Sequence, residues 1–113
     1  MTWRAIYKAN VLKEKYGVLG KVASRYLLAG FDVRIRDDLI YVRGKGVNEV
    51  LGVIVSERDV DRVLNKLKEI KDKVGLSVTA VFYGNKKWGD EVTSKFKDQG
   101  IKVRFIRGDQ DFR

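Results

Sequence analysis

Carboxylate, lysine, tyrosine and serine side chains are the groups in this sequence that could carry chemistry. The 113-residue chain contains no histidine and no cysteine. It therefore has no imidazole base, no thiol nucleophile and no imidazole or thiolate ligand for a metal ion. A Ser-His triad, an iron–sulfur cluster and a thiolate zinc site are excluded. Any catalysis would depend on carboxylates, helped by lysine and a hard cation such as Mg²⁺.

Basic residues dominate the charge of the chain. Its 24 Lys and Arg residues outnumber its 15 Asp and Glu residues, which gives a formal net charge of +9. Such an excess on a small domain favours a polyanionic partner, with nucleic acid ahead of anionic lipid. A basic surface that serves only solubility is the alternative.

Six basic residues are expected to form one surface. Arg34 and Arg36 alternate with the apolar Val33 and Ile35, so both arginines should project from the exposed face of a strand. Arg43 and Lys45 would lie at the adjoining turn, and Lys21 and Arg25 on the preceding helix. The full set is Lys21, Arg25, Arg34, Arg36, Arg43 and Lys45. This spacing suits contacts with successive phosphates, and a solvated strand face is the alternative.

A second basic cluster is formed by Lys86 and Lys87, which are followed by Trp88. Paired lysines and an indole ring in a loop could bind a nucleic-acid backbone and stack on an unpaired base. Trp88 also begins an apolar stripe that continues at Val92 and Phe96, and this spacing favours a core tryptophan.

The hydrophobic periodicity predicts how these residues are positioned. A helical stretch over residues 5–29 is interrupted at Gly17 and Gly20, so it is either one helix or two pieces. Period-two alternation and turn signals predict five strands, and two further apolar stripes predict helices. The predicted strands span residues 31–36, 39–42, 50–55, 78–83 and 101–106, and the later helices span residues 59–74 and 88–96.

The element order is therefore α-β-β-β-α-β-α-β, within a single domain of residues 1–113. It predicts an α/β fold with a mixed sheet flanked by helices. Residues 31–56 should form an antiparallel meander. The strand over residues 78–83 should join that meander in parallel.

Three stretches of the chain carry a resemblance to a known family. They are residues 16–33, where a helix ends in a Gly-Phe-x-Val step, Asp38-Leu39-Ile40, where an acid heads a strand, and residues 84–106, where a helix precedes a strand. They resemble the first helix, the metal-binding aspartate of the second strand, and the closing helix and strand of the restriction-endonuclease-like, or PD-(D/E)xK, nucleases. The sequence detail points to the archaeal Holliday-junction-resolvase and Mrr-like branches of that superfamily.

The resemblance implies a Mg²⁺ site that this sequence does not complete. The family needs an acid and a lysine on the third strand, where this chain has Ile54 and Ser56, and Lys21 stands where an early acid is usual. We therefore expect a degenerate nuclease with no assigned catalytic residue and no cofactor. In a displaced active site, Asp38 and Glu57 would hold Mg²⁺. Glu57 could equally serve as a negative charge at a helix N-terminus.

Three functions remain open at this point. The first is a nucleic-acid-binding protein, with DNA favoured over RNA, on a nuclease-like fold that has lost its catalytic residues. The second is an active Mg²⁺-dependent nuclease that uses Asp38 and Glu57. The third is a noncatalytic subunit or scaffold, either a homodimer or paired with an active relative. We expect a cytoplasmic protein without a membrane partner, because no apolar run is long enough for a membrane span.

Overall fold

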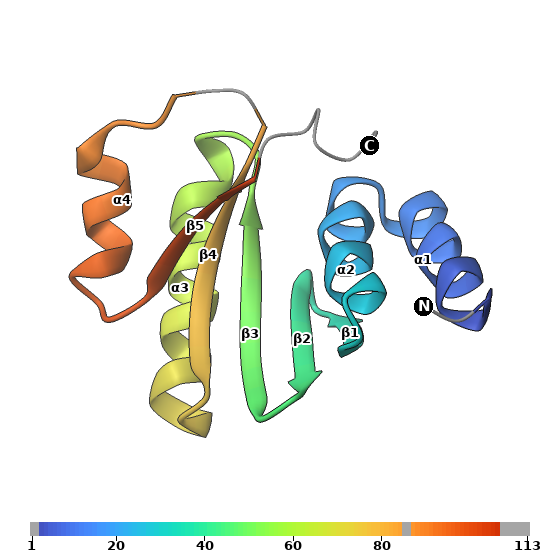
Figure 1. Ribbon diagram of the computed structural model, residues 1–113. Coiled ribbons are helices and arrows are strands. Elements are labelled where there is room, and N and C mark those ends of the chain that lie inside the picture. Colours follow the sequence, from blue (N-terminus) through green and yellow to red (C-terminus); the bar gives the residue numbers. More distant parts are fainter. Residues whose placement is uncertain (1–2, 85–86, 107–113) are drawn as a thin grey trace. The chain divides into compact units, whose positions relative to one another are not determined.

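The structure is a computed structural model that describes residues 3–84 and 87–106. Within these residues it is an α/β fold with a five-stranded mixed sheet, whose hydrogen-bonded strand order is β1-β2-β3-β4-β5. Figure 1 shows the elements. They are α1 (Trp3–Tyr16), α2 (Val18–Leu28), β1 (Asp32–Arg36), β2 (Leu39–Gly44), β3 (Val47–Ile54), α3 (Arg58–Val74), β4 (Ser77–Tyr83), α4 (Asp90–Lys97) and β5 (Lys102–Ile106).

The predicted order of elements is confirmed, although several element bounds differ, and β3 begins at Val47 instead of residue 50. The first helical stretch is two helices, because Gly17 takes a positive φ of 59° between α1 and α2. The expected helix over residues 88–96 begins later, at Asp90, so the prediction that Trp88 lies in this helix is wrong. Gly89, in an extended conformation, separates Trp88 from α4.

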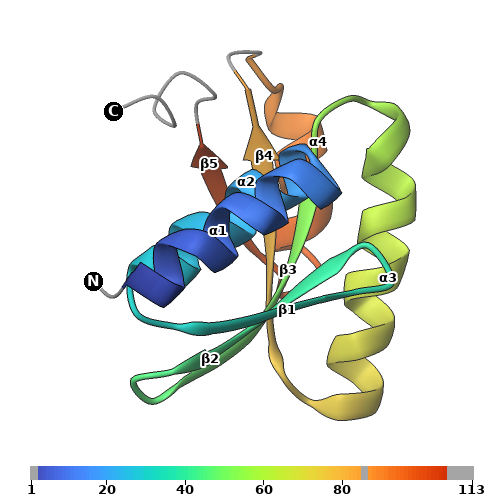
Figure 2. The same ribbon diagram turned by 90° about the vertical axis from the view of Figure 1, so that its right-hand side faces the viewer.

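The chain divides into two compact units, the first ending at Glu49 and the second beginning at Val50. In the first unit, α2 packs against β1 and β2, and α1 packs against α2. Figure 2 shows α1 as the layer outside α2. Val22 and Ala23 of α2 are fully buried, together with Ile40 of β2. The hydrophobic core of this unit therefore lies between α2 and the hairpin.

Helices α1 and α2 approach each other closely at Gly20. This glycine is buried in α2, and a Cβ atom added to it would overlap the backbone carbonyl of Leu12 in α1. Ala9 of α1 is also buried, with 1% of its surface exposed. Small residues at these positions therefore let the two helix backbones pack together.

Strands β1 and β2 form an antiparallel hairpin with a two-residue turn. The turn residues Asp37 and Asp38 have φ angles of 55° and 62°, and positive φ at both central positions is characteristic of a type I′ turn. Arg36 pairs with Leu39 across this turn. The antiparallel pairing predicted for the first two strands is thus confirmed.

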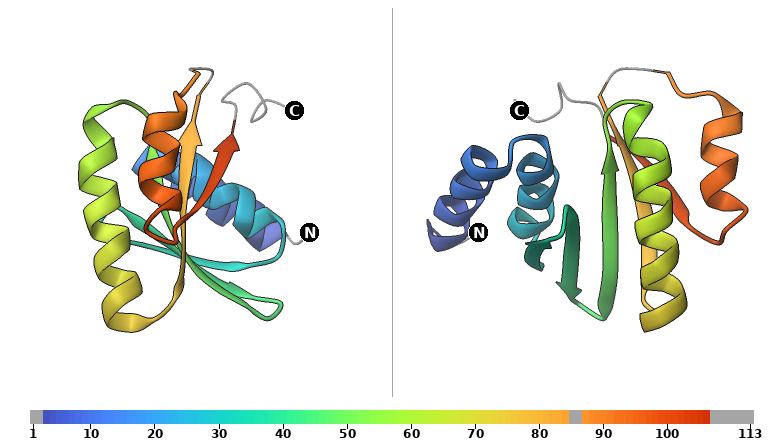
Figure 3. Two further views of the ribbon diagram at one scale, coloured as in Figure 1. Left: turned by 90° about the vertical axis from the view of Figure 1, so that its left-hand side faces the viewer. Right: turned by 180° about the vertical axis from the view of Figure 1, so that it is seen from behind.

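The second unit contains residues 50–54 of β3 and the elements that follow. Figure 1 shows β3 and β4 running in the same direction, and β5 pairs with β4 in parallel. Figure 3 shows α3 and α4 beside each other on one side of β4. Gly52 of β3 allows α3 to pack closely, because a Cβ atom there would meet Val63 and Leu67.

Aromatic rings cluster around Phe82 of β4, from the buried Phe96 of α4 to Phe105 of β5, which is 60% exposed. Phe82 of β4 is 1% exposed, and its ring centroid lies 5.0 Å from Trp88, 5.6 Å from Phe96 and 5.5 Å from Phe105. The adjacent helices α3 and α4 are linked by Lys71, whose Nζ donates a hydrogen bond to the carbonyl oxygen of Gln99 at 2.7 Å. Apolar packing and this polar contact together hold α4 in place.

The close approach at Gly20 gives a prediction about stability. Alanine in a helix is ordinarily more stable than glycine by about 1 kcal/mol, but the added methyl group would force α1 and α2 apart. We therefore expect Gly20→Ala to lower the free energy of unfolding by about 1–3 kcal/mol, as measured by chemical denaturation. Asn65→Ala, at an exposed position of α3, is the control, with an expected change within about 0.5 kcal/mol. An unchanged or higher stability of Gly20→Ala would contradict the close packing.

Candidate nucleic-acid interface

The register of the hairpin assigns each of its residues to one of two faces. Residues directly opposite each other in an antiparallel pair lie on the same face. Val33 pairs with Val42 and Ile35 pairs with Ile40, and three of these four side chains are buried while Ile35 is half-buried. This apolar face is covered by α2, whose Tyr26 ring lies 6.1 Å from the Phe31 ring next to β1.

The opposite face of the hairpin carries the arginines. Arg34 pairs with Tyr41, Arg36 pairs with Leu39, and Asp32 pairs with Arg43. All three arginines are exposed, Tyr41 is half-buried and Leu39 is buried. We call this the arginine face and define it by Arg34, Arg36 and Arg43. It brings together three of the six basic residues that were expected from the sequence to form one surface.

Lys21 and Arg25 lie elsewhere in the first unit. Both belong to α2, where Lys21 is half-buried and Arg25 is exposed. Because α2 covers the apolar face of the hairpin, these two residues lie on the opposite side of the hairpin from the arginine face. The structure therefore does not join all six basic residues into one surface.

Lys45 makes contacts that stabilise the fold. Its Nζ donates a hydrogen bond to the carbonyl oxygen of Ala29 at 2.6 Å and lies 5.0 Å from the centre of the Phe31 ring. Ala29 follows the last residue of α2, where carbonyl groups lack a partner within the helix and attract positive charge. The ammonium group of Lys45 thus caps α2.

The second basic cluster lies partly within the described residues. Lys86 lies outside them, whereas Lys87 is exposed and Trp88 is half-buried. The Trp88 ring packs against Phe82, with an angle of 57° between the ring planes. This contact supports a core role for Trp88, and Lys87 remains a candidate for phosphate binding.

Asp38, the acid that resembles a nuclease metal ligand, is the second residue of the β1–β2 turn. Its φ of 62° is a conformation that aspartate and asparagine tolerate better than most residues. On the third strand, Ile54 is fully buried and offers no oxygen ligand. These residues do not fit the Mg²⁺ site of the nuclease family. Within residues 3–84 and 87–106, no three acidic side chains gather as a possible cation site.

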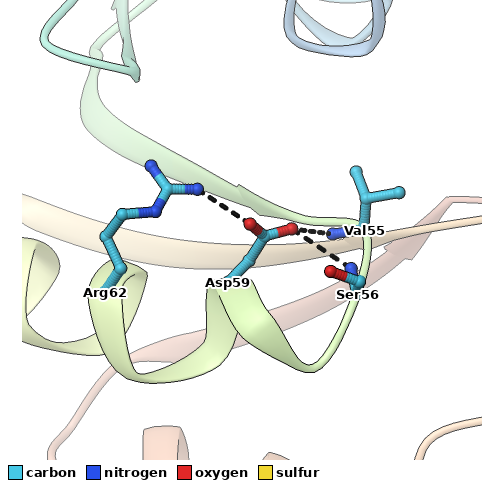
Figure 4. Close-up of polar contacts among 4 residues, drawn as sticks. All are labelled: Val55, Ser56, Asp59 and Arg62. Atoms are coloured by element: carbon cyan, nitrogen blue, oxygen red, sulfur yellow. Dashed lines mark hydrogen bonds and ion pairs between the residues drawn. The ribbon is translucent and has the colours of Figure 1, made fainter.

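Glu57 precedes the first residue of α3 and is exposed, and Glu49 is buried on β3. The acid that stabilises the start of α3 is Asp59, as Figure 4 shows. Its Oδ2 accepts hydrogen bonds from the backbone N–H groups of Val55, at 3.0 Å, and Ser56, at 3.1 Å. Its Oδ1 accepts one from Arg62 Nη2 at 2.9 Å. Asp59 thereby makes the backbone contact expected of the acid in a capping box.

Comparison of the chain with protein-family models, with curated proteins and with solved structures found no match. Among the helices in the described part of the chain, none is long and apolar enough to cross a membrane. The candidate site therefore depends on the geometry of the hairpin alone.

Tyr41 was not identified from the sequence as part of the site, although a two-residue turn at Asp37 and Asp38 would have placed it opposite Arg34.

The carboxylate of Asp59 gives a prediction about pH. Burial by itself raises the pKa of Asp59, but hydrogen bonds from Val55, Arg62 and Ser56 outweigh it and lower the pKa below the ordinary value of 3.8. A lowered pKa stabilises the fold above the unfolded-state pKa, and this stabilisation is lost as the pH falls through the folded-state pKa. We expect Asp59→Asn to lower the free energy of unfolding by about 0.5–2 kcal/mol at neutral pH.

The difference between wild type and Asp59→Asn should shrink as the pH falls below about 4. Urea denaturation at a series of pH values measures it. Asp61→Asn is the control, because Asp61 lies exposed in the same first turn of α3 and should show a smaller loss. A loss in Asp59→Asn that stays constant down to strongly acidic pH would contradict the role of the charged carboxylate.

Proposed function

We propose that this chain binds nucleic acid through the arginine face, with DNA favoured over RNA. The observation that carries the proposal is the hairpin register, which places three exposed guanidinium groups on one face. Guanidinium groups bind phosphate oxygens in a planar, bidentate geometry. Phosphate contacts of this kind give affinity without sequence preference. The proposed location of this activity is the cytoplasm.

The proposed fold family is that of the restriction-endonuclease-like nucleases, with the catalytic residues lost. The mixed five-stranded sheet and the order of helices and strands support this proposal. The loss of activity is supported by the buried side chain of Ile54 and by the position of Asp38 in a turn. No cofactor is part of the proposed function.

Substitution of two arginines tests the binding site. Three phosphate contacts predict a log–log salt slope of about −2.7 on duplex DNA, because each contact releases about 0.9 of a counterion. Arg34→Ala/Arg36→Ala should weaken binding to all sequences alike and flatten the slope by up to about 1.8. Fluorescence anisotropy titrations over a salt series measure both effects. The free energy of unfolding should change by no more than about 0.5 kcal/mol for each exposed position.

The matched control removes the same charge from another surface. Lys68→Ala/Lys95→Ala eliminates two exposed basic side chains of α3 and α4 and should leave most of the affinity and slope intact. If both double variants lose affinity equally, the arginine face is not the site. If Arg34→Ala/Arg36→Ala binds like wild type throughout the salt series, the site must lie elsewhere, and Lys87 becomes the next candidate.

The loss of catalysis is tested by cleavage assays. We expect no cleavage of branched, duplex or single-stranded substrates in the presence of Mg²⁺ or Mn²⁺, because Ile54 provides no second acidic ligand. Cleavage that disappears in Asp38→Asn but persists in Asp72→Asn would instead establish the active nuclease, with Glu57 as the second ligand. Asparagine tolerates the positive φ at position 38, so the hairpin should be retained. Asp72 is an exposed acid of α3.

A second candidate function, a noncatalytic subunit or scaffold, is favoured by the outer side of α1. Trp3 is 80% exposed and Tyr7 is 61% exposed, and Ile6 and Val11 are also exposed. The rings of Trp3 and Tyr7 stack at 6.0 Å. Exposed apolar strips of this kind are common in contacts between proteins, here with a second copy or an active relative. Weak nucleic-acid binding together with self-association that persists in high salt would favour this candidate.

A further inference from the structure

Tyr41 lies at the centre of the arginine face. It is directly opposite Arg34 in the register, at a typical Cβ–Cβ separation of about 4.5–5.5 Å. Arg43 is two residues further along the same strand, and Arg36 is a diagonal neighbour across the hairpin. Long side chains reach such diagonal neighbours. The register thus places Tyr41 between the positions of the three arginines on this face.

The backbone that carries Tyr41 is firmly held. Its neighbours Ile40 and Val42 point into the core and are 0% and 1% exposed, whereas Tyr41 is half-buried. A tyrosine ring has few rotatable bonds, so ordering it on a ligand costs little conformational entropy. Tyr41 therefore combines a fixed position with a partly accessible aromatic surface.

Carboxylates limit the positive region at both ends. Asp32 lies directly opposite Arg43, and Asp37 and Asp38 form the turn that follows Arg36. Negative charges at these places weaken the attraction of phosphate at the ends of the hairpin. The most favourable position for an anion is the middle of the face, beside Tyr41 and Arg34.

We propose that the arginine face selects single-stranded nucleic acid by stacking an unpaired base on Tyr41 while the arginines bind the adjacent phosphates. This inference rests on the proposed nucleic-acid-binding function. In a duplex, each base is already stacked between its neighbours and presents no free ring face. Aromatic stacking is therefore gained only with unpaired bases, and it tolerates any sequence because every base has a π-face. The arginines contribute with either ligand.

The test compares variants at position 41 on paired and unpaired ligands. Tyr41→Leu retains an apolar side chain for the half-buried position but removes the aromatic ring, and Tyr41→Phe retains the ring. Anisotropy titrations would use a labelled oligothymidylate and a mixed-sequence duplex of the same length. Tyr16→Leu is the matched control, because Tyr16 is an exposed tyrosine on α1, away from the arginine face. Circular dichroism would verify that each variant is folded.

We expect Tyr41→Leu to weaken binding of the single strand by about 5- to 150-fold, the range for loss of one base–aromatic stack. Binding of the duplex should change less than about twofold, because no stack is lost with that ligand. Tyr41→Phe and Tyr16→Leu should bind both ligands like wild type. Quenching of a 2-aminopurine base in the single strand should persist in Tyr41→Phe and disappear in Tyr41→Leu. The salt slope should be unchanged in Tyr41→Leu, since no charge is removed.

Two results would overturn the inference while the proposed function stands. One is single-strand binding by Tyr41→Leu that equals wild type, while Arg34→Ala/Arg36→Ala weakens both ligands. The other is an equal loss of single-strand and duplex affinity in Tyr41→Leu, which would show that Tyr41 maintains the conformation of the hairpin and does not stack on a base. If the wild-type protein binds neither ligand at low salt, the proposed function itself fails, and the inference fails with it.

Discussion

The two-residue turn at Asp37 and Asp38 is the constraint on which the candidate site depends. A strand has a side-chain period of two, so a shift of one residue in register moves every side chain to the other face. The turn pairs Arg36 with Leu39, and this pairing places Val33 on the apolar face and Arg34 on the arginine face. Burial of the apolar face and exposure of the arginines are therefore consequences of the same local geometry.

The net charge of the chain does not measure the charge available for binding. Lys45 donates a hydrogen bond to the carbonyl oxygen of Ala29 at the end of α2, and Lys71 donates one to that of Gln99 just beyond α4. Positive charge near the C-terminus of a helix interacts favourably with the helix dipole. Both lysines therefore contribute to stability within their own unit. The arginine face holds a smaller but more localised charge, which is the basis of the proposed phosphate site.

The sequence predicted the helices and strands better than it predicted the side of the sheet on which each helix packs. Alternation and helical periodicity report which residues of one element share a face, so the strands around Val33 and Phe82 and the helix ending at Gly75 were predictable. The side on which α2 packs, and hence the separation of Lys21 from Arg34, depends on tertiary contacts that periodicity does not report. Trp88 shows the same limit. Its spacing imitates a helix position, although the ring reaches the core from the segment before α4.

The proposed loss of nuclease chemistry has a physical explanation in the core of the second unit. Ile54 is fully buried on β3, where an acid would lose its hydration at a cost of several kcal/mol unless a cation compensated for it. An acid at this position and its metal ion are thus gained or lost together. Isoleucine avoids that cost, and burial of its side chain contributes about 1.5–3 kcal/mol. Once binding alone is required of such a fold, an apolar residue at position 54 is favoured by stability.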